Sequence, residues 1–514
     1  MKTNMLATAA HIASQNRKNK KSGNRTNKIL VVYAFDPQET QTIKRWTHQH
    51  HLRALEYYTT DHEIVYYNVW EDLKRPGNIA EWSLAELSHE MPTRLRGIDF
   101  DVVILHYSFL AYRWFYPSPV PDFFYRWKIH FGWIGEMQCV KIAIPQDEAD
   151  HCEVLDEWLF EWGISAVLTN FGAEGVKVIY PLLGQCADFY SCHPGYIDDE
   201  TAAKYINKLT PLKLRPLDIV YRARHLPYWV GARGQMKWII GDEVAKCAIK
   251  HGLKVDISTR PEDTIFEGWF DFLASSKATL GCEGGFSAPN WRGEYHFWLN
   301  KLMAQNPALT FDEFSAQMPP GWDGYEQLAI TGPRHFDAVF TKTCQILVEG
   351  YYRGALQADK HYIPLKCDFS NLDEVLEKLK DVRYVEEVVE RAYADIYLSG
   401  EYTYRKFVEL IETAIFNAQY PLQEKMDDGK INLMTTNENT VQALERTLVA
   451  ERHSKAFLEA KLLEVGMIMN THQTSLISGL ISYQVKWNRR LALLVLGSMA
   501  VSVIVSLVIA LWLR

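Results

Sequence analysis

The chain has 514 residues, too many for one hydrophobic core, and this length suits two domains with appended segments. Its 47% hydrophobic and 23% charged content is typical of a globular protein, and the net charge of −8 excludes a general nucleic-acid binder. None of the eight cysteines forms a CxxC pair, so we expect buried, reduced thiols and no structural zinc site.

The first 27 residues form a basic segment that contains no acid. Its basic run follows a mildly apolar stretch, which is the reverse of the order in a signal peptide. We expect a disordered, solvated tail at 1–27, with electrostatic attachment to an anionic membrane as the alternative.

Residues 28–205 show the alternation that is typical of an α/β domain. Helical stretches such as 121–133 and 149–162 separate apolar, β-rich runs at 28–35, 63–70, 100–109, 140–148 and 164–171. Continuous apolar strands joined by helices predict a parallel sheet covered on both faces, and hence a doubly wound, Rossmann-like domain.

The same pattern restarts near Pro216 and predicts a second Rossmann-like domain at 213–400. We expect strands at 217–224, 254–260, 278–283 and 345–350, and helices at 235–252, 267–276, 292–304, 333–343 and 371–380. A helical stretch at 384–420 follows them. Two such domains bind ligands in a cleft, at the carboxyl ends of their strands.

Residues 426–440 are typical of a linker, and residues 441–485 of a helical stalk. From Val441 to Leu476 the pattern alternates spacings of three and four residues, as in a coiled coil, although Glu451 and Lys455 interrupt the seam. The segment 441–476 therefore predicts either a homo-oligomer or a single juxtamembrane helix.

Residues 491–513 carry no charge and are long enough to cross a bilayer as a helix. Lys486, Arg489 and Arg490 precede this segment, and only Arg514 follows it. By the positive-inside rule the body of the protein stays in the cytoplasm. We expect a single-pass C-terminal transmembrane anchor.

The most specific motif is PRHFDAVFTKTCQILVEGYYRGALQADKHYIPLKCDFSNL, residues 333–372. It resembles the donor-nucleotide end of GT-B glycosyltransferases, most closely a group of bacterial group-1-like enzymes with a HYIPLKxDFSN element. The resemblance covers roughly residues 213–415 well, and the first domain only by architecture.

The resemblance implies the fold and the reaction class, and the C-terminal segment adds the location at a membrane. The fold would be GT-B, with a helix at 401–425 that crosses back to the first domain. The protein would move a sugar from a nucleotide-sugar donor to a glycan or lipid-linked acceptor for surface polysaccharide, at the bacterial inner membrane. It would need no cofactor and no obligatory metal. The alternatives are an inactive GT-B-like membrane scaffold and a sugar-nucleotide epimerase.

Basic residues after the first strand of the second domain are candidates for binding the donor diphosphate. Arg222 and Arg224 end this strand, glycines follow, and Lys237 is expected to open a helix. In the family pattern, basic side chains and helix N-termini at these places stabilise the departing diphosphate. The alternative is a set of ordinary surface cations beside a turn.

Arg334 and Asp337 lie in the PRxF element, where the family has a Glu that binds the donor ribose. Here that residue is an Asp, and Ala329 stands where retaining members carry another Glu, so a retaining mechanism and activity itself are in doubt. An acid early in a helix also stabilises the helix dipole, which is the alternative role of Asp337. Further donor-site candidates follow the neighbouring strands: Glu283, Gly284, Glu349 and Gly350.

The first domain offers two candidates for a general base, His106 and Asp36, each at the end of an expected strand. His106 is the first choice because the ordinary pKa of histidine lies near neutral pH. A histidine at a strand end is also commonly a hydrogen-bonded structural residue, so that alternative stays open.

Overall fold

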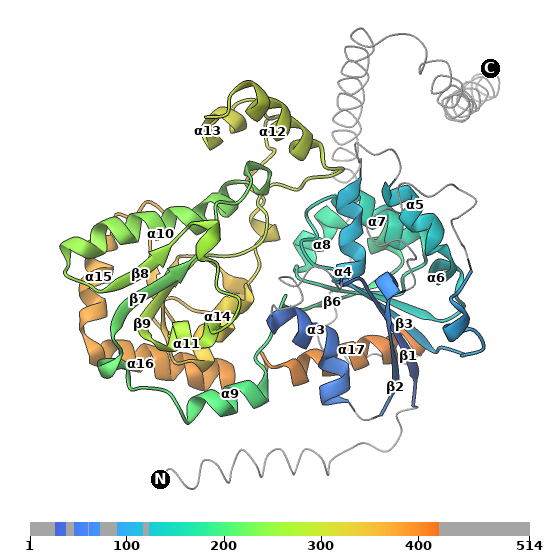
Figure 1. The fold of residues 1–514 in the computed structure, drawn as a ribbon, viewed down its shortest axis with the longest axis horizontal. Helices are drawn as coiled ribbons and strands as arrows, with labels where there is room; N and C mark the ends of the chain where they lie inside the picture. The colour runs from blue at the N-terminus through green and yellow to red at the C-terminus, as the bar shows by residue number, and fades with distance from the viewer. Residues whose placement is uncertain (1–25, 37–45, 60, 72–89, 117–122, 421–514) are drawn as a thin grey trace, which may run out of the picture. The chain divides into compact units, whose positions relative to one another are not determined.

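The computed structural model describes residues 26–36, 46–59, 61–71, 90–116 and 123–420. Within these ranges the chain forms two β-sheets whose strands all pair in parallel, with helices packed on them (Figure 1). The prediction of two parallel-sheet α/β domains is confirmed. The tail to residue 25, the linker at 426–440, the stalk and the expected membrane span lie outside the described residues. No helix of the described ranges is long and apolar enough to span a bilayer.

The first sheet has six strands. Their order across the sheet is β2 (Glu63–Asn68), β1 (Lys28–Tyr33), β3 (Val102–His106), β4 (Val140–Ile144), β5 (Ala166–Thr169) and β6 (Asp188–Ser191). The chain runs from β1 outward to β2 and then across to β3, so the strand order reverses between β1 and β3. Such a reversal is the topological switch point at which open α/β sheets bind ligands.

Both faces of the first sheet are buried because alternate strand residues point to opposite sides. Leu30 and Val32 of β1 lie in one apolar cluster, and Ile29 and Val31 lie in another. Helices contribute to the first cluster: α4 (Tyr107–Leu110), α5 (Phe123–His130), α6 (Gly132–Glu136), α7 (Cys152–Glu161) and α8 (Ala173–Ile179). The other face is covered by α3 (Trp46–Tyr58) and a later helix.

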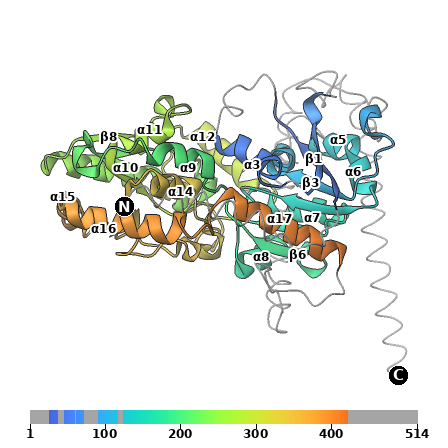
Figure 2. The same ribbon diagram turned by 90° about the horizontal axis from the view of Figure 1, so that it is seen from below.

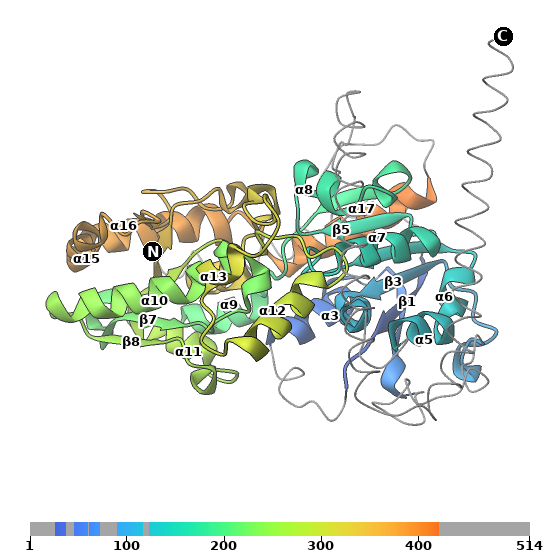
Figure 3. The same ribbon diagram turned by 90° about the horizontal axis from the view of Figure 1, so that it is seen from above.

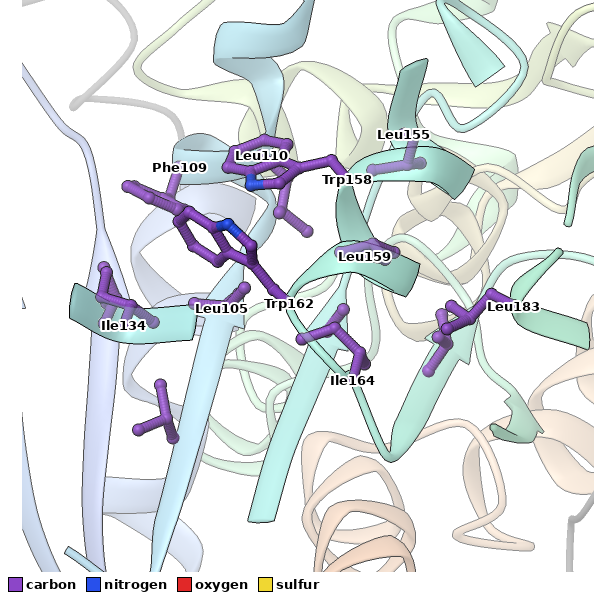
Figure 4. Packing of buried hydrophobic residues seen from close by; sticks show 14 of the residues in the cluster. Leu105, Phe109, Leu110, Ile134, Leu155, Trp158, Leu159, Trp162, Ile164 and Leu183 are labelled. Carbon is purple, nitrogen blue, oxygen red and sulfur yellow. The ribbon is translucent and has the colours of Figure 1, made fainter. Parts of the chain in front are cut away.

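Aromatic side chains form the centre of the first cluster (Figure 4). The rings of Phe109 and Trp158 lie 5.5 Å apart between their centroids, and Trp162 lies 5.2 Å from Trp158. Rings at such distances add about 0.5–1.5 kcal/mol per pair to the free energy of burying their surface. This cluster holds α4 and α7 against the strands whose carboxyl ends face the site described below.

The second sheet has five strands, in the order β11 (Ile363–Leu365), β10 (Cys344–Val348), β9 (Ser276–Gly281), β7 (Leu217–Arg222) and β8 (Val255–Ser258). Its strand order reverses between β7 and β9. The helices of this half are α9 (Asp199–Ile206), α10 (Ala232–Lys250), α11 (Trp269–Ala274), α14 (Pro333–Phe340), α15 (Leu372–Lys380) and α16 (Val382–Ala392). Two further helices, α12 (Glu294–Gln305) and α13 (Phe311–Ser315), lie between β9 and α14 in the sequence.

The last described helix, α17 (Tyr404–Gln419), packs on the first sheet although it follows the second in the chain (Figure 2). Its residues Phe407 and Ile411 are buried in the same cluster as Ile29 and Ile104. Arg353, after β10, also joins the two halves, because its guanidinium donates to Asn170 O and to Ser191 Oγ.

Candidate nucleotide-binding site

A cavity of about 470 Å³ lies at the carboxyl ends of β7 and β9, the switch point of the second sheet. Residues of the first half complete its wall: Tyr107, Gln146, Asp147 and Pro194. Six residues that the sequence predicts for donor binding line the cavity: Arg222, Arg224, Lys237, Gly284, Arg334 and Asp337.

Arg222 faces the cavity, but its guanidinium is held by the protein. It donates to Tyr221 O at 2.9 Å and to Asp256 O at 3.0 Å, and it pairs with the Asp256 carboxylate at 2.8 Å. Its carbon Cζ also lies 4.5 Å from the centre of the Phe272 ring. The guanidinium also donates from Nε to Asp263 O at 3.1 Å. These contacts assign Arg222 to holding β7 against the β8 region and use four of its five donors.

Three other cations of the cavity have no carboxylate partner in the described ranges: Arg224, Lys237 and Arg334. Arg334 donates to Arg222 O at 3.1 Å, and its guanidinium lies over the rings of Tyr221 and Trp269. Burial lowers the pKa of Lys237, because a charged ammonium group loses its water there. An anion in the cavity would restore favourable charge contacts to all three.

Lys237 lies in the second turn of α10 and not at its start, because α10 begins at Ala232. The first free N–H groups of α10 are already capped: Ala232 N donates to Asp323 Oδ2 at 2.7 Å, and Arg233 N donates to Ser287 Oγ at 3.1 Å. Gly231 permits this close approach, with φ of 82° and a Cβ position only 2.4 Å from Ser287 Oγ. The start of α10 is therefore not available to a phosphate.

The N-terminus of α14 borders the cavity through Gly332, Pro333 and Arg334. It has no side-chain cap and no acidic residue in its first turn. Uncapped N–H groups and the positive end of a helix dipole attract anions. With the Arg334 guanidinium beside them, these groups make the start of α14 the best-placed part of the cavity for a phosphate.

Asp337 lies in the second turn of α14, so its alternative role as an acid in the first turn is wrong: the first turn of this helix carries no acid. The carboxylate is buried and accepts a hydrogen bond from Trp269 Nε1 at 2.9 Å. Burial raises the pKa of Asp337 to about 7, against the lowering effects of Trp269 and of the Arg334 charge. At neutral pH the group therefore accepts or donates a hydrogen bond with similar ease.

Replacing Asp337 with asparagine is expected to increase stability at alkaline pH. Between about pH 4 and 7 the unfolded carboxyl ionises while the folded one stays protonated, so the wild-type free energy of unfolding falls as pH rises. The loss is at most about 4 kcal/mol, since one pKa unit is about 1.4 kcal/mol. Urea unfolding of both proteins should give similar stabilities at pH 4 and a more stable variant at pH 8. A stability difference that does not change with pH would contradict the raised pKa.

Three predicted donor-site residues lie outside the cavity lining: Glu283, Glu349 and Gly350. The Glu283 carboxylate accepts a hydrogen bond from Tyr352 N at 2.6 Å, and a Cβ at Gly350 would lie 2.8 Å from it. Glu283 therefore holds the loop after β10, and Gly350 leaves room for it. Glu349 is exposed. The donor-binding role of these three stays a prediction.

His106 is only 2% exposed and does not line the cavity. Its Nδ1 lies 2.9 Å from Ser108 Oγ, and its Nε2 lies 3.2 Å from His51 Nδ1. Both ring nitrogens thus have partners inside the first half, which favours a structural role. Asp36, after β1, is half-buried and also lies outside the lining. The catalytic role of both stays a prediction.

The first half brings to the cavity residues that the sequence did not single out. Gln146 and Asp147 follow β4, and Asp147 has a φ of 47°, which few non-glycine residues adopt. The buried Arg113 holds this loop by donating to Gln146 O, Asp147 O and Asp150 O at 2.7–3.0 Å. The signal in the sequence was the polar stretch directly after the apolar strand, at the end of the sheet where ligands bind.

No protein-family model and no curated protein matches the sequence. Among solved structures, the chain is similar to an α1,3-fucosyltransferase, with a TM-score of 0.34 and 11% identity over 77% of this chain and 92% of the other. It is also similar to Anabaena HepE in complex with UDP-glucose, with a TM-score of 0.36 and 10% identity over 75% and 99%. A sucrose-phosphate synthase from Thermosynechococcus elongatus gives a TM-score of 0.38 and 11% identity over 77% and 100%. These identities and TM-scores assign the chain to no family.

Proposed function

We propose that this chain is a glycosyltransferase that binds a nucleotide-sugar donor in the cavity. The observation that carries the proposal is the set of three cations, Arg224, Lys237 and Arg334, without carboxylate partners in the described ranges, at the switch point of a parallel sheet. A diphosphate supplies the negative charge that these groups lack, and charge-assisted hydrogen bonds to it are strong. The resemblance of residues 333–372 to the donor end of GT-B enzymes supports the same ligand.

The transfer step follows from the charges around the cavity. The acceptor hydroxyl oxygen bonds to the anomeric carbon of the sugar while the bond from that carbon to the diphosphate breaks. The electron pair leaves with the diphosphate, where Arg224, Lys237 and Arg334 stabilise it. Asp337 faces the same cavity and is the group that binds the ribose hydroxyls.

A base must take the proton of the acceptor hydroxyl in an inverting reaction. Among the described lining residues the carboxylates are Asp147 and Asp337, and only Asp147 comes from the first half. Asp337 is buried against Trp269, so Asp147 is the better candidate, ahead of His106 and Asp36.

The test uses the full-length protein with a panel of UDP-, GDP-, ADP- and TDP-sugars, and measures binding by calorimetry and release of the nucleoside diphosphate. Asp147→Asn should reduce turnover by about 100-fold or more while donor affinity stays unchanged. Asp99→Asn is the matched control, because Asp99 is an exposed carboxylate that precedes β3, at the other end of the same sheet. Failure of every nucleoside diphosphate and nucleotide sugar to bind would contradict the proposed function.

A nucleotide-sugar-binding scaffold without turnover is the second candidate. The shorter Asp337 in place of Glu, with its carboxylate already bonded to Trp269, favours it. The same experiment separates the two, since a scaffold would bind the donor and release no nucleotide with any acceptor.

The proposal extends to the location of the enzyme. The uncharged segment 491–513 and its basic flank support a C-terminal anchor in the bacterial inner membrane, the membrane that would also hold a lipid-linked acceptor. The full-length protein should leave the membrane with detergent and not with a high-salt wash. If salt alone released the protein, the proposed membrane anchor would be wrong.

A further inference from the structure

Four side chains that can ligate a metal meet where α10 ends and α15 begins. Cys247 lies on α10 and His251, four residues later, is the C-cap residue of that helix, while Asp373 and Glu377 lie four residues apart on α15. A spacing of four places each pair on one face of its helix. The two helices are neighbours and share the apolar cluster on one face of the second sheet (Figure 3).

Three of the donor atoms converge on one point. Cys247 Sγ lies 3.2 Å from Asp373 Oδ1, and His251 Nε2 lies 2.8 Å from the same oxygen. The ligand atoms of Cys247, His251 and Asp373 all lie within 4.8 Å of one another. Around a tetrahedral ion these atoms would sit about 3.3–3.6 Å apart, so small side-chain adjustments make room for one.

Glu377 is placed to bind His251 and not the metal itself. Its Oε1 lies 2.7 Å from His251 Nδ1, the ring nitrogen on the other side from Asp373. A carboxylate on one imidazole nitrogen fixes the tautomer and orients the other nitrogen toward a metal. The cluster thus contains three ligands and the group that positions one of them.

We propose that Cys247, His251 and Asp373 bind a zinc ion, with Glu377 as the positioning residue for His251. Thiolate and imidazole ligands favour Zn²⁺ over Mg²⁺ and Ca²⁺, which prefer oxygen ligands. The exposed side of the cluster leaves the fourth position to water. A search for CxxC pairs could not find this site, because two of its ligands, Cys247 and Asp373, are 126 residues apart in the sequence.

Two side chains of the cluster have a raised pKa. The Cys247 thiol has a raised pKa because of partial burial and the neighbouring Asp373, and the hydrogen bonds to Asp373 and Glu377 raise the pKa of His251. Lys250 and Lys380 also face the cluster, and Lys380 Nζ lies 2.6 Å from Glu377 Oε1. Zinc must displace the protons, so its affinity should increase with pH.

The zinc site is separate from the nucleotide cavity. Cys247 lies ten residues beyond Lys237 on α10, about 15 Å along the helix axis at 1.5 Å per residue. The ion would join the C-terminal end of α10 to α15 and stabilise this half of the fold. Its test therefore does not depend on the proposed glycosyl transfer.

The experiment titrates Co²⁺ into metal-free full-length protein and follows the sulfur-to-cobalt charge-transfer absorption, which reports a thiolate ligand. We expect one equivalent to bind, Zn²⁺ to remove the band, and Mg²⁺ to leave it. Cys247→Ser should abolish the band, and Glu377→Gln should weaken binding by about 10- to 100-fold. Cys367→Ser is the matched control, since Cys367 is exposed and lies outside the cluster.

Zinc should also raise the thermal unfolding midpoint of the wild type and of Cys367→Ser, and leave that of Cys247→Ser unchanged. The metal-free melting curves of all three proteins show whether each of them folds. If Cys247→Ser does not fold, His251→Ala replaces it in the experiment. A missing charge-transfer band in the wild type, or an equal band in Cys247→Ser, would overturn the proposal.

Discussion

Replacing Lys237 or Arg334 with alanine is expected to weaken nucleoside diphosphate binding by about 10- to 100-fold each. A charge-assisted hydrogen bond contributes about 1.5–3 kcal/mol, and a factor of ten is about 1.4 kcal/mol. Neither side chain forms a salt bridge with a carboxylate in the part of the chain that the structure describes, so its removal breaks no ion pair within the protein. The exposed Arg224 should contribute less, because water screens its charge.

Calorimetric titration of each variant with the nucleotide that binds the wild type measures this effect. Lys246→Ala is the matched control: it lies on the same helix as Lys237, is exposed and pairs with Glu243, so affinity should not change. Arg222→Ala should instead lower the unfolding midpoint, because Arg222 bonds to backbone carbonyls of β7 and β8. If both the Lys237 and the Arg334 variant bound the nucleotide with wild-type affinity, the prediction that the diphosphate binds in this cavity would be wrong.

Continuous apolar runs predicted the central strands of both sheets well. The expected strands at 28–35 and 140–148 contain β1 and β4, because a strand buried on both faces is apolar at most positions. The strands β6 and β11 were not predicted. Each lies at the edge of its sheet, β6 reads DFYS, and β11 has three residues, so neither leaves a periodic signal.

The expected helical stretch at 384–420 is divided in the structure. It contains α16, a short π-helical turn at Tyr393–Tyr397, and then α17. Gly400, with φ of 77°, lies in the turn between them. Local helix propensity on both sides conceals this turn, and only the packing of α17 on the first sheet requires it.

The sequence could predict those residues of the candidate site that lie at or just after the carboxyl end of a strand. Arg222 ends β7, Arg224 lies just after it, and Gly284 lies just after β9; the carboxyl ends of such parallel strands meet at one edge. Glu349 also follows a strand, but it is exposed and lies outside the cavity lining, so its donor-binding role stays a prediction. Asp147 belongs to the first half of the chain, and it reaches the cavity only because the first half folds against the second. No local sequence pattern encodes that arrangement.

The loop that carries Asp147 depends on one buried arginine. Arg113 is fully buried, and its guanidinium donates to four backbone carbonyls: Leu110, Gln146, Asp147 and Asp150. Burial lowers the pKa of this guanidinium, because no water surrounds the charge. The four carbonyl groups compensate for the lost hydration of the guanidinium only while all of them accept its hydrogen bonds. The same hydrogen bonds also hold Asp147 and His151 in their left-handed conformations.

Arg113→Met keeps an unbranched side chain but removes the guanidinium and every donor, so buried carbonyls lose their partners. A buried polar group without a partner costs about 1–3 kcal/mol, and we expect a total loss of at least about 3 kcal/mol in the free energy of unfolding. Urea unfolding measures this loss, with Arg53→Met as the control, because Arg53 is exposed on α3 and should change stability by no more than about 0.5 kcal/mol. Where the variant still folds, the freed loop should lower turnover more than donor affinity, since the loop carries Asp147 and none of the three cations. Arg113→Met with wild-type stability and turnover would mean that the loop after β4 holds its conformation without the arginine.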